Sequence, residues 1–201
     1  MPSPPRKMFL TPEEYLAIDR ASELRYEFYD GEMFPVGDPP RALNGLSLQR
    51  NRIGGNLFSD IHHQLDGHRF EVFFSDIRVT LDGNEFAYPD IVIVAGKPEL
   101  IPDKLDSLLN PQVIIEVLSH PSDEWDWGHR FNRYQQRSSF QQYILIDRDA
   151  PVVASANRRS DGQWVWTEAN WPDGVLVLDS VGIKVPLRDI YRRVFMPDHL
   201  A

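Results

Sequence analysis

Apolar residues recur along this chain with two different periods. Short runs rich in Val, Ile and Phe, bounded by turn residues, are typical of buried strands. Such runs occupy residues 71–74, 77–81, 88–94, 113–118 and 142–147. Helical spacing instead predicts a long helix over 43–65 and a second over about 123–137, whose inner face carries Trp127, Phe131 and Tyr134.

The remaining boundaries are set by local signals. Thr11-Pro12-Glu13-Glu14 is a helix start with a capping box, and it predicts a helix over about 12–19. Asp30-Gly31 predicts a tight hairpin turn between two strands. A loop is expected over 96–110. The other predicted elements are hairpin strands at 25–29 and 32–36, antiparallel strands at 152–157, 163–168 and 175–178, and a closing helix at 187–194.

This order of elements predicts an α+β domain with a mixed sheet and antiparallel strands towards the C-terminus. The 201 residues suffice for one well-buried domain, expected at 9–195, after a disordered Pro-rich lead at 1–8 and before a tail at 196–201. Cysteine is absent, so disulfides and thiolate metal sites are excluded. No apolar run approaches a membrane span, which favours a cytoplasmic protein.

Two carboxylates interrupt runs that should be apolar. Asp90 lies within Tyr88–Val94, and Glu116 lies within Val113–Leu118. A buried carboxylate is costly unless a partner or a metal compensates its charge. Oxygen ligands of this kind suit Mg²⁺, for which Mn²⁺ can substitute. His62 and His63 lack a ligand partner one helical turn away, which argues against zinc.

Seven stretches then stand in order along nearly the whole chain: YEFYDGE at 26–32, NRIGGNL at 51–57, VFFSDIRV at 72–79, YPDIV at 88–92, LNP at 109–111, IEVLS at 115–119 and YILID at 143–147. The ordered set resembles the restriction-endonuclease family of the Uma type, a branch of the PD-(D/E)xK nuclease superfamily. Pro89-Asp90 alone would be a weak motif, but the ordered set is specific.

The resemblance implies a restriction-endonuclease-like core, in which a central mixed β-sheet is flanked by helices and is followed by extra antiparallel strands towards the C-terminus. It also implies a metal site at this sheet. Asp90, Glu116 and the Val117 carbonyl would hold the ion, and Glu27 matches an acid that joins this site in the superfamily. The catalytic Lys of the common form would stand at Leu118, whereas related families carry it on the following helix. That position is Arg130 in this chain.

A second departure lies before NRIGGNL, where the family often has His and this chain has Arg50. Arginine stays protonated, so Arg130 can bind phosphate but cannot abstract a proton. Water would then need activation by the metal or by the substrate. Arg130 could also be a helix-surface partner of Asp126. Arg50, Arg52 and Tyr134 are candidate nucleic-acid contacts, against the simpler interpretation of a solvated helix face and a core tyrosine.

Three functional hypotheses follow. The first is a Mg²⁺-dependent endonuclease acting on nucleic acid, DNA rather than RNA, as a homodimer. The net charge of −9 argues against nonspecific coating of nucleic acid but allows a local basic groove. The second is a nuclease-fold module that only binds nucleic acid or protein, which the two arginines favour. The third is a carboxylate-pair glycoside hydrolase. Trp164 and Trp166 share one strand face, which makes a dimer contact plausible.

Overall fold

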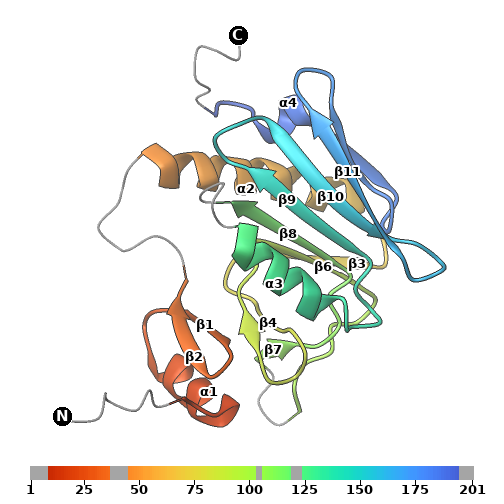
Figure 1. Ribbon diagram of the computed structural model, residues 1–201. Helices are drawn as coiled ribbons and strands as arrows, with labels where there is room; N and C mark the ends of the chain where they lie inside the picture. Colours follow the sequence, from red (N-terminus) through yellow and green to blue (C-terminus); the bar gives the residue numbers. More distant parts are fainter. Residues whose placement is uncertain (1–8, 37–44, 103–105, 119–123, 195–201) are drawn as a thin grey trace.

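The structure is a computed structural model that describes residues 9–36, 45–102, 106–118 and 124–194. The lead at 1–8 and the tail at 196–201 lie outside the described residues. A six-stranded sheet runs through the centre in the order β11-β10-β9-β8-β6-β3 (Figure 1). Its strands are β3 (Phe70–Phe74), β6 (Ile91–Ala95), β8 (Val113–Leu118), β9 (Gln142–Asp147), β10 (Val152–Arg158) and β11 (Trp164–Asn170). Since β8 and β9 run parallel and the other neighbours run antiparallel, the sheet is mixed, as the sequence predicts.

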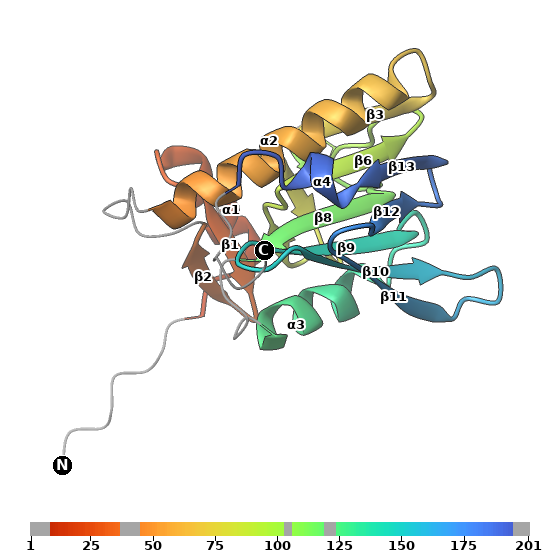
Figure 2. The ribbon, with the colours of Figure 1, turned by 90° about the horizontal axis from the view of Figure 1, so that it is seen from above.

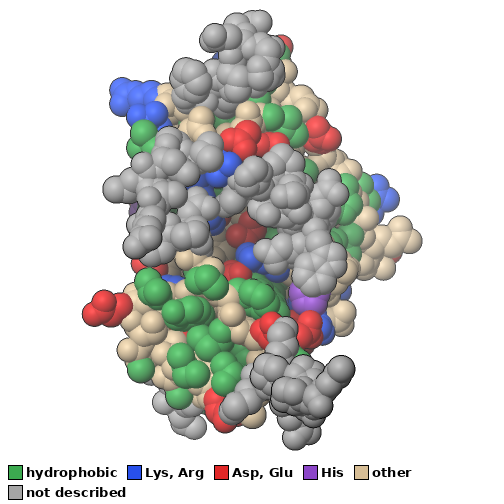
Figure 3. All heavy atoms as spheres, turned by 60° about the vertical axis from the view of Figure 1, so that its left-hand side comes forward, with side chains coloured by type: hydrophobic (Ala, Val, Ile, Leu, Met, Phe, Trp, Pro, Cys, Tyr) green, Lys and Arg blue, Asp and Glu red, His purple; other side chains and the backbone are tan. Residues whose placement is uncertain are grey.

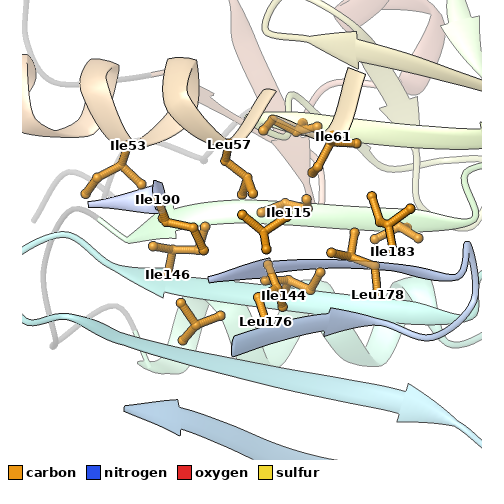
Figure 4. Close-up of a cluster of buried hydrophobic side chains, with 14 of the residues drawn as sticks. Ile53, Leu57, Ile61, Ile115, Ile144, Ile146, Leu176, Leu178, Ile183 and Ile190 are labelled. Carbon is orange, nitrogen blue, oxygen red and sulfur yellow. The ribbon is translucent and has the colours of Figure 1, made fainter. Parts of the chain in front are cut away.

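Helices cover both faces of this sheet, as Figure 2 shows. On one face lie the long helix α2 (Gly45–Leu65), the two-stranded sheet of β12 (Val175–Leu178) and β13 (Ile183–Pro186), and the short helix α4 (Leu187–Ile190). On the other face lies α3 (Glu124–Tyr134). Ile53, Leu57 and Ile61 of α2 point onto the sheet, where they pack with its apolar side chains (Figure 4). Their spacing of four residues places them on one side of the helix.

The alternation of side chains along β6 and β8 fixes which layer each residue enters. Ile91 and Ile93 belong to the core beneath α2, whereas Val92 and Val94 belong to the core beneath α3. In β8, Val113, Ile115 and Val117 join the α2 side and Ile114 joins the α3 side. Glu116 therefore faces the α3 layer. Figure 4 shows Ile115 among the residues beneath α2.

A second, smaller sheet lies beside the first and has the order β2-β1-β5-β4-β7. Its strands are β1 (Tyr26–Tyr29), β2 (Glu32–Pro35), β4 (Arg78–Thr80), β5 (Phe86–Ala87) and β7 (Ser107–Leu108). Helix α1 (Pro12–Ala21) packs on it, because Tyr15 stacks on Phe28 with ring centroids 4.8 Å apart. The capping box at Thr11 is present, and Asp30 and Gly31 have the positive φ angles of the predicted hairpin turn.

Several predicted boundaries are wrong. Asp90 does not lie within its strand: β6 begins at Ile91, and Asp90 occupies a bend after Pro89, which has no N–H for a ladder. The predicted loop 96–110 contains β7. The closing helix ends at Ile190 rather than 194, and α3 ends at Tyr134 rather than 137. The short strands β5 and β13 were not predicted.

Gly54 shows why the glycine pair in α2 is compatible with a helix. A Cβ atom at Gly54 would lie 3.0 Å from the ring of Phe74 in β3. The absence of a side chain therefore lets α2 approach the edge of the sheet closely. The cost of glycine in a helix interior, roughly 1 kcal/mol relative to alanine, is offset by this packing.

Candidate metal and phosphate site

Asp90 and Glu116 meet where β6 and β8 pair. The antiparallel register places Ile91 opposite Ile115, so Asp90 stands level with Glu116. The Val117 N–H donates a hydrogen bond of 2.8 Å to Asp90 Oδ2. The bend before β6 thus turns the Asp90 carboxylate onto β8, which connects the two predicted metal ligands through the backbone of Val117.

Arg50 reaches the same carboxylate from α2. Its Nη2 lies 2.9 Å from Asp90 Oδ1 and 3.0 Å from Oδ2, and its Nε donates to Oδ1 at 3.2 Å. Three contacts from one planar guanidinium make this a forked, charge-assisted pair. Both side chains are partly accessible to solvent. Arg50, at the position where the family often has His, therefore pairs with a predicted metal ligand.

Glu27 comes from the hairpin strand β1. Its Oε1 accepts a hydrogen bond of 3.1 Å from the Tyr88 N–H, and its Oε2 accepts one of 2.6 Å from Arg130 Nη2. Arg130 also contacts Glu116, since its Nη1 lies 3.4 Å from Glu116 Oε1. Arg130 thus bridges two of the predicted ligands from helix α3. The side chain of Asp126 lies outside the description, so its predicted pairing with Arg130 is not addressed.

Among the residues that the structure describes, the ionisable groups at this site do not balance. Three carboxylates, those of Glu27, Asp90 and Glu116, face two guanidinium groups. Glu116 is only 6% exposed. Burial raises the pKa of Glu116 to about 8; Arg130 opposes the rise, and the negative charges of Asp90 and Glu27 add to it. A cation arriving at Glu116 would therefore relieve a buried, under-compensated carboxyl group.

Two hydroxyl groups beside the carboxylates lack hydrogen bonds. Tyr29 Oη and Tyr134 Oη are buried, and neither has a partner among the residues that the structure describes. Burial raises the pKa of both hydroxyls, and the charges of Glu27 and Glu116 contribute to the rise. Buried polar groups of this kind are normally satisfied by water or a ligand. Together with the carboxylate oxygens, they fit a hydrated hard cation.

The other predicted contacts lie in different environments. Tyr134 is fully buried and packs on Phe140 and Tyr143, so its side chain presents no surface to nucleic acid. Arg52 is exposed, and its Nη1 donates to the Arg193 carbonyl at 2.9 Å. Figure 3 shows basic and acidic side chains meeting in the middle of one face, beside an apolar surface.

A neighbouring cluster of possible metal ligands was not predicted from the sequence. Asp30, Glu85 and His129 offer ligand atoms that all lie within 4.8 Å of one another, a geometry compatible with a metal ion. In the described part of the chain, Glu27, Asp90 and Glu116 do not form such a tight group. Arg133 lies at the neighbouring cluster, with its Nε 3.1 Å from Glu85 Oε2. Glu85 sits in a turn without any pattern that would have singled it out.

Comparison with known proteins places this arrangement in context. The sequence pattern of the family described as "Uma2: Putative restriction endonuclease" matches residues 12–188. An uncharacterised Synechocystis protein, sll1609, is 30% identical over 160 residues, which cover 79% of this chain and 86% of that protein. A second, slr1290, is 24% identical over 184 residues, 91% of this chain and 92% of that protein.

A solved structure shares the fold. It is described as a putative nuclease belonging to DUF820 from Anabaena variabilis ATCC 29413. The TM-score is 0.71 at 18% identity, and the match covers 92% of this chain and 99% of that one. The α+β fold with a central mixed sheet is thereby confirmed. None of the described helices has the length and apolar character needed to cross a membrane.

Proposed function

We propose that this chain, which belongs to the Uma2 family of restriction-endonuclease-like proteins, is a metal-dependent endonuclease that hydrolyses phosphodiester bonds of nucleic acid, DNA in preference to RNA. One observation supports this proposal above all. Glu27, Asp90 and Glu116 come from separate segments and converge at one end of β8, together with a bridging arginine. Glu27 and Glu116 are buried and Asp90 is partly buried, and this set of carboxylates has no evident role in packing.

The donor set favours Mg²⁺ or Mn²⁺, held by Asp90, Glu116, Glu27 and the Val117 carbonyl. When bound, such an ion supplies Lewis-acid polarisation of the phosphate and a water of lowered pKa. The protein's own groups orient the substrate. Arg130 is held by Glu27 at 2.6 Å beside Glu116, where its positive charge can stabilise a phosphate oxygen. Because arginine stays protonated, Arg130 stabilises charge and moves no proton.

The proposal is tested by cleavage of plasmid DNA, single-stranded DNA and RNA in the presence of Mg²⁺ or Mn²⁺. We expect Glu116→Gln and Asp90→Asn to abolish cleavage while the fold persists in circular dichroism. Glu71→Gln, a change of the same kind at an exposed position of β3, should leave cleavage intact. Wild-type protein that cuts none of these substrates with either ion would refute the proposal.

Arg130 variants define the role of the bridging cation. Arg130→Ala should reduce kcat strongly, because two carboxylates lose their shared partner and the phosphate loses a donor. Arg130→Lys should retain or raise activity, since a compact cation replaces the guanidinium. Equal activity of Arg130→Ala and wild type would show that Arg130 has no part in turnover.

A second candidate function is supported by the same arginines. Arg50 and Arg130 already compensate most of the carboxylate charge, an arrangement suited to a nuclease-fold module that binds nucleic acid or protein without cleaving it. Fluorescence anisotropy with labelled DNA, together with the cleavage assay, distinguishes the binding module from the endonuclease. Binding that persists with EDTA, without cleavage under any condition, would favour the module.

We also propose that the protein is cytoplasmic and forms a homodimer. The dimer is expected because two sites are needed to cut both strands of a duplex. Trp164 and Trp166 both pack against Phe131 of α3, with ring centroids 5.1 and 5.2 Å apart, and Trp166 remains 41% exposed. The predicted dimer contact would thus lie beside α3. A monomeric mass in light scattering at micromolar concentrations would refute the dimer.

A further inference from the structure

The pair of Arg50 and Asp90 joins two elements that are distant in sequence. Arg50 belongs to α2, and Asp90 stands 40 positions later, in the bend just before β6. The guanidinium contacts both carboxylate oxygens, and Oδ2 also accepts the Val117 N–H. The carboxylate is therefore engaged on the two oxygens that a cation would use.

A guanidinium and a divalent cation make different demands on a carboxylate. Arginine binds through directional hydrogen bonds to the oxygen lone pairs. A small divalent ion requires the same lone pairs at much shorter range. Two positive groups cannot share one carboxylate at such distances without strong repulsion. Arg50 and a metal ion thus compete for Asp90.

The partial exposure of Arg50 allows its side chain to move away from Asp90. Its side chain is 26% exposed and that of Asp90 is 18% exposed, so the pair lies at the rim of the site. The side chain of Arg130 is less exposed, at 16%, and contacts Glu27 at 2.6 Å and Glu116 at 3.4 Å. A released Arg50 would remain anchored on α2 next to the carboxylates, where a substrate phosphate would meet it.

We propose that Arg50 is a resident counter-ion, which neutralises Asp90 in the metal-free site and turns to the substrate phosphate when a divalent cation binds Asp90. This inference rests on the proposed function and concerns the regulation of the same site. The cation alone must displace Arg50, so it binds weakly. A phosphate gives the displaced guanidinium a new partner, so cation and phosphate bind cooperatively.

Isothermal titration with Mn²⁺ tests the competition without relying on turnover. Arg50→Ala should bind Mn²⁺ about tenfold more tightly than wild type, which corresponds to the loss of one charge-assisted pair of about 1.4 kcal/mol. Arg52→Ala removes the same charge two positions away on α2, where the side chain contacts a carbonyl. It should change Mn²⁺ affinity less than about twofold, because exposed charges are screened.

Arg50→Gln is a second variant that keeps a hydrogen-bond donor near Asp90 and removes the charge. It should also bind Mn²⁺ more tightly than wild type, and it guards against misfolding of Arg50→Ala. Folding of each variant is checked by thermal unfolding without metal. If Arg50 is purely structural, both variants should lose stability and bind Mn²⁺ no better than wild type, which would overturn the inference.

Cooperativity gives an independent readout. Thymidine 5′-phosphate, which has no phosphodiester bond to cut, should raise the Mn²⁺ affinity of wild type several-fold and that of Arg50→Ala much less. Equal enhancement in both proteins would overturn the transfer of Arg50 to phosphate. Tight Mn²⁺ binding by Arg50→Ala without any cleavage by wild type would refute the proposed function and leave the inference standing. If wild type cleaves nucleic acid and Arg50→Ala binds Mn²⁺ no more tightly than wild type, the inference would be refuted and the proposed function would stand.

Discussion

Two of the clusters of arginine and carboxylate groups in the described residues differ in how their charges balance. In the first, Arg78 contacts Asp19 at 2.5 Å and Asp106 at 2.6 Å, and Arg20 also pairs with Asp106. Tyr88 Oη donates to Asp19 at 2.6 Å. Two arginines face two aspartates at short range. Although burial raises the pKa of Asp106, the hydrogen bonds from Arg20 and Arg78 hold it below the usual value.

The second cluster, at the candidate site, has three carboxylates for two arginines within the described part of the chain. Its Arg130–Glu116 contact is long, at 3.4 Å, and the pKa of Glu116 is raised to about 8 by burial, against the pull of Arg130. The matched cluster satisfies its charges within the fold. The unmatched cluster leaves a carboxyl group for which a further cation would be favourable. Perturbed carboxyl groups of this kind are typical of functional sites.

The largest effect is expected in the matched cluster. Arg78→Met should destabilise the protein by about 3–5 kcal/mol, because Asp19 would be left buried without its cation. Urea unfolding measures the change. Arg188→Ala, at an exposed position of α4, should stay within about 0.5 kcal/mol of wild type. A loss for Arg78→Met as small as that of the control would show that the cluster contributes little to the fold.

Glu116 should give the unmatched cluster a characteristic pH dependence. Its pKa in the folded chain, about 8, exceeds the ordinary value of 4.5, so the folded state binds more protons between these values. The stability that Glu116 contributes is thus complete below about pH 4.5 and is lost as pH rises through 8. The slope for one group is at most about 1.4 kcal/mol per pH unit.

Glu116→Gln removes this titration. The stability of the variant relative to wild type should therefore increase as pH rises from 5 to 8, as measured by unfolding in metal-free buffer. Glu168→Gln, at the exposed face of β11, should follow wild type across the range. A difference between Glu116→Gln and wild type that does not vary with pH would contradict the raised pKa.

Tyr88 contacts both clusters through different groups. Its hydroxyl donates a hydrogen bond to Asp19, whereas its backbone N–H donates one to Glu27. Tyr88→Phe should cost about 2 kcal/mol of stability, since a hydrogen bond to a charged group is lost. Mn²⁺ affinity should not change, because the backbone contact persists. Weaker Mn²⁺ binding by Tyr88→Phe than by the control Tyr26→Phe would show that the clusters are coupled.

The elements of the fold that could be predicted from the sequence are those set by local signals. The cap at Thr11 and the turn at Asp30-Gly31 act over a few residues and are confirmed. The buried runs gave the central strands because their apolar character is continuous. The two-residue strands β5 and β7 leave no readable period, and they depend on partners elsewhere in the small sheet.

The candidate site was predictable only in part. Asp90 and Glu116 could be predicted because carboxylates are rare in apolar runs. Glu27 and Arg130 were implied only by the family resemblance. The sequence offered no sign that Arg50 would pair with Asp90, since 40 positions separate them and only the packing of α2 on the sheet brings them together. The cluster of Asp30, Glu85 and His129 likewise depends on contact between a hairpin, a turn and α3.

The smallest effect is expected at Arg52, which belongs to neither cluster. Its contact with the Arg193 carbonyl is exposed, so Arg52→Ala should change stability by less than about 1 kcal/mol. If Arg52 meets a phosphate, as the sequence suggests, the variant should bind DNA a few-fold more weakly, with a salt dependence reduced by about one unit of slope. Anisotropy titrations over a range of salt concentrations measure both quantities. An unchanged slope would assign Arg52 to the solvated face of α2 and leave Arg50 and Arg130 as the cations that a phosphate meets.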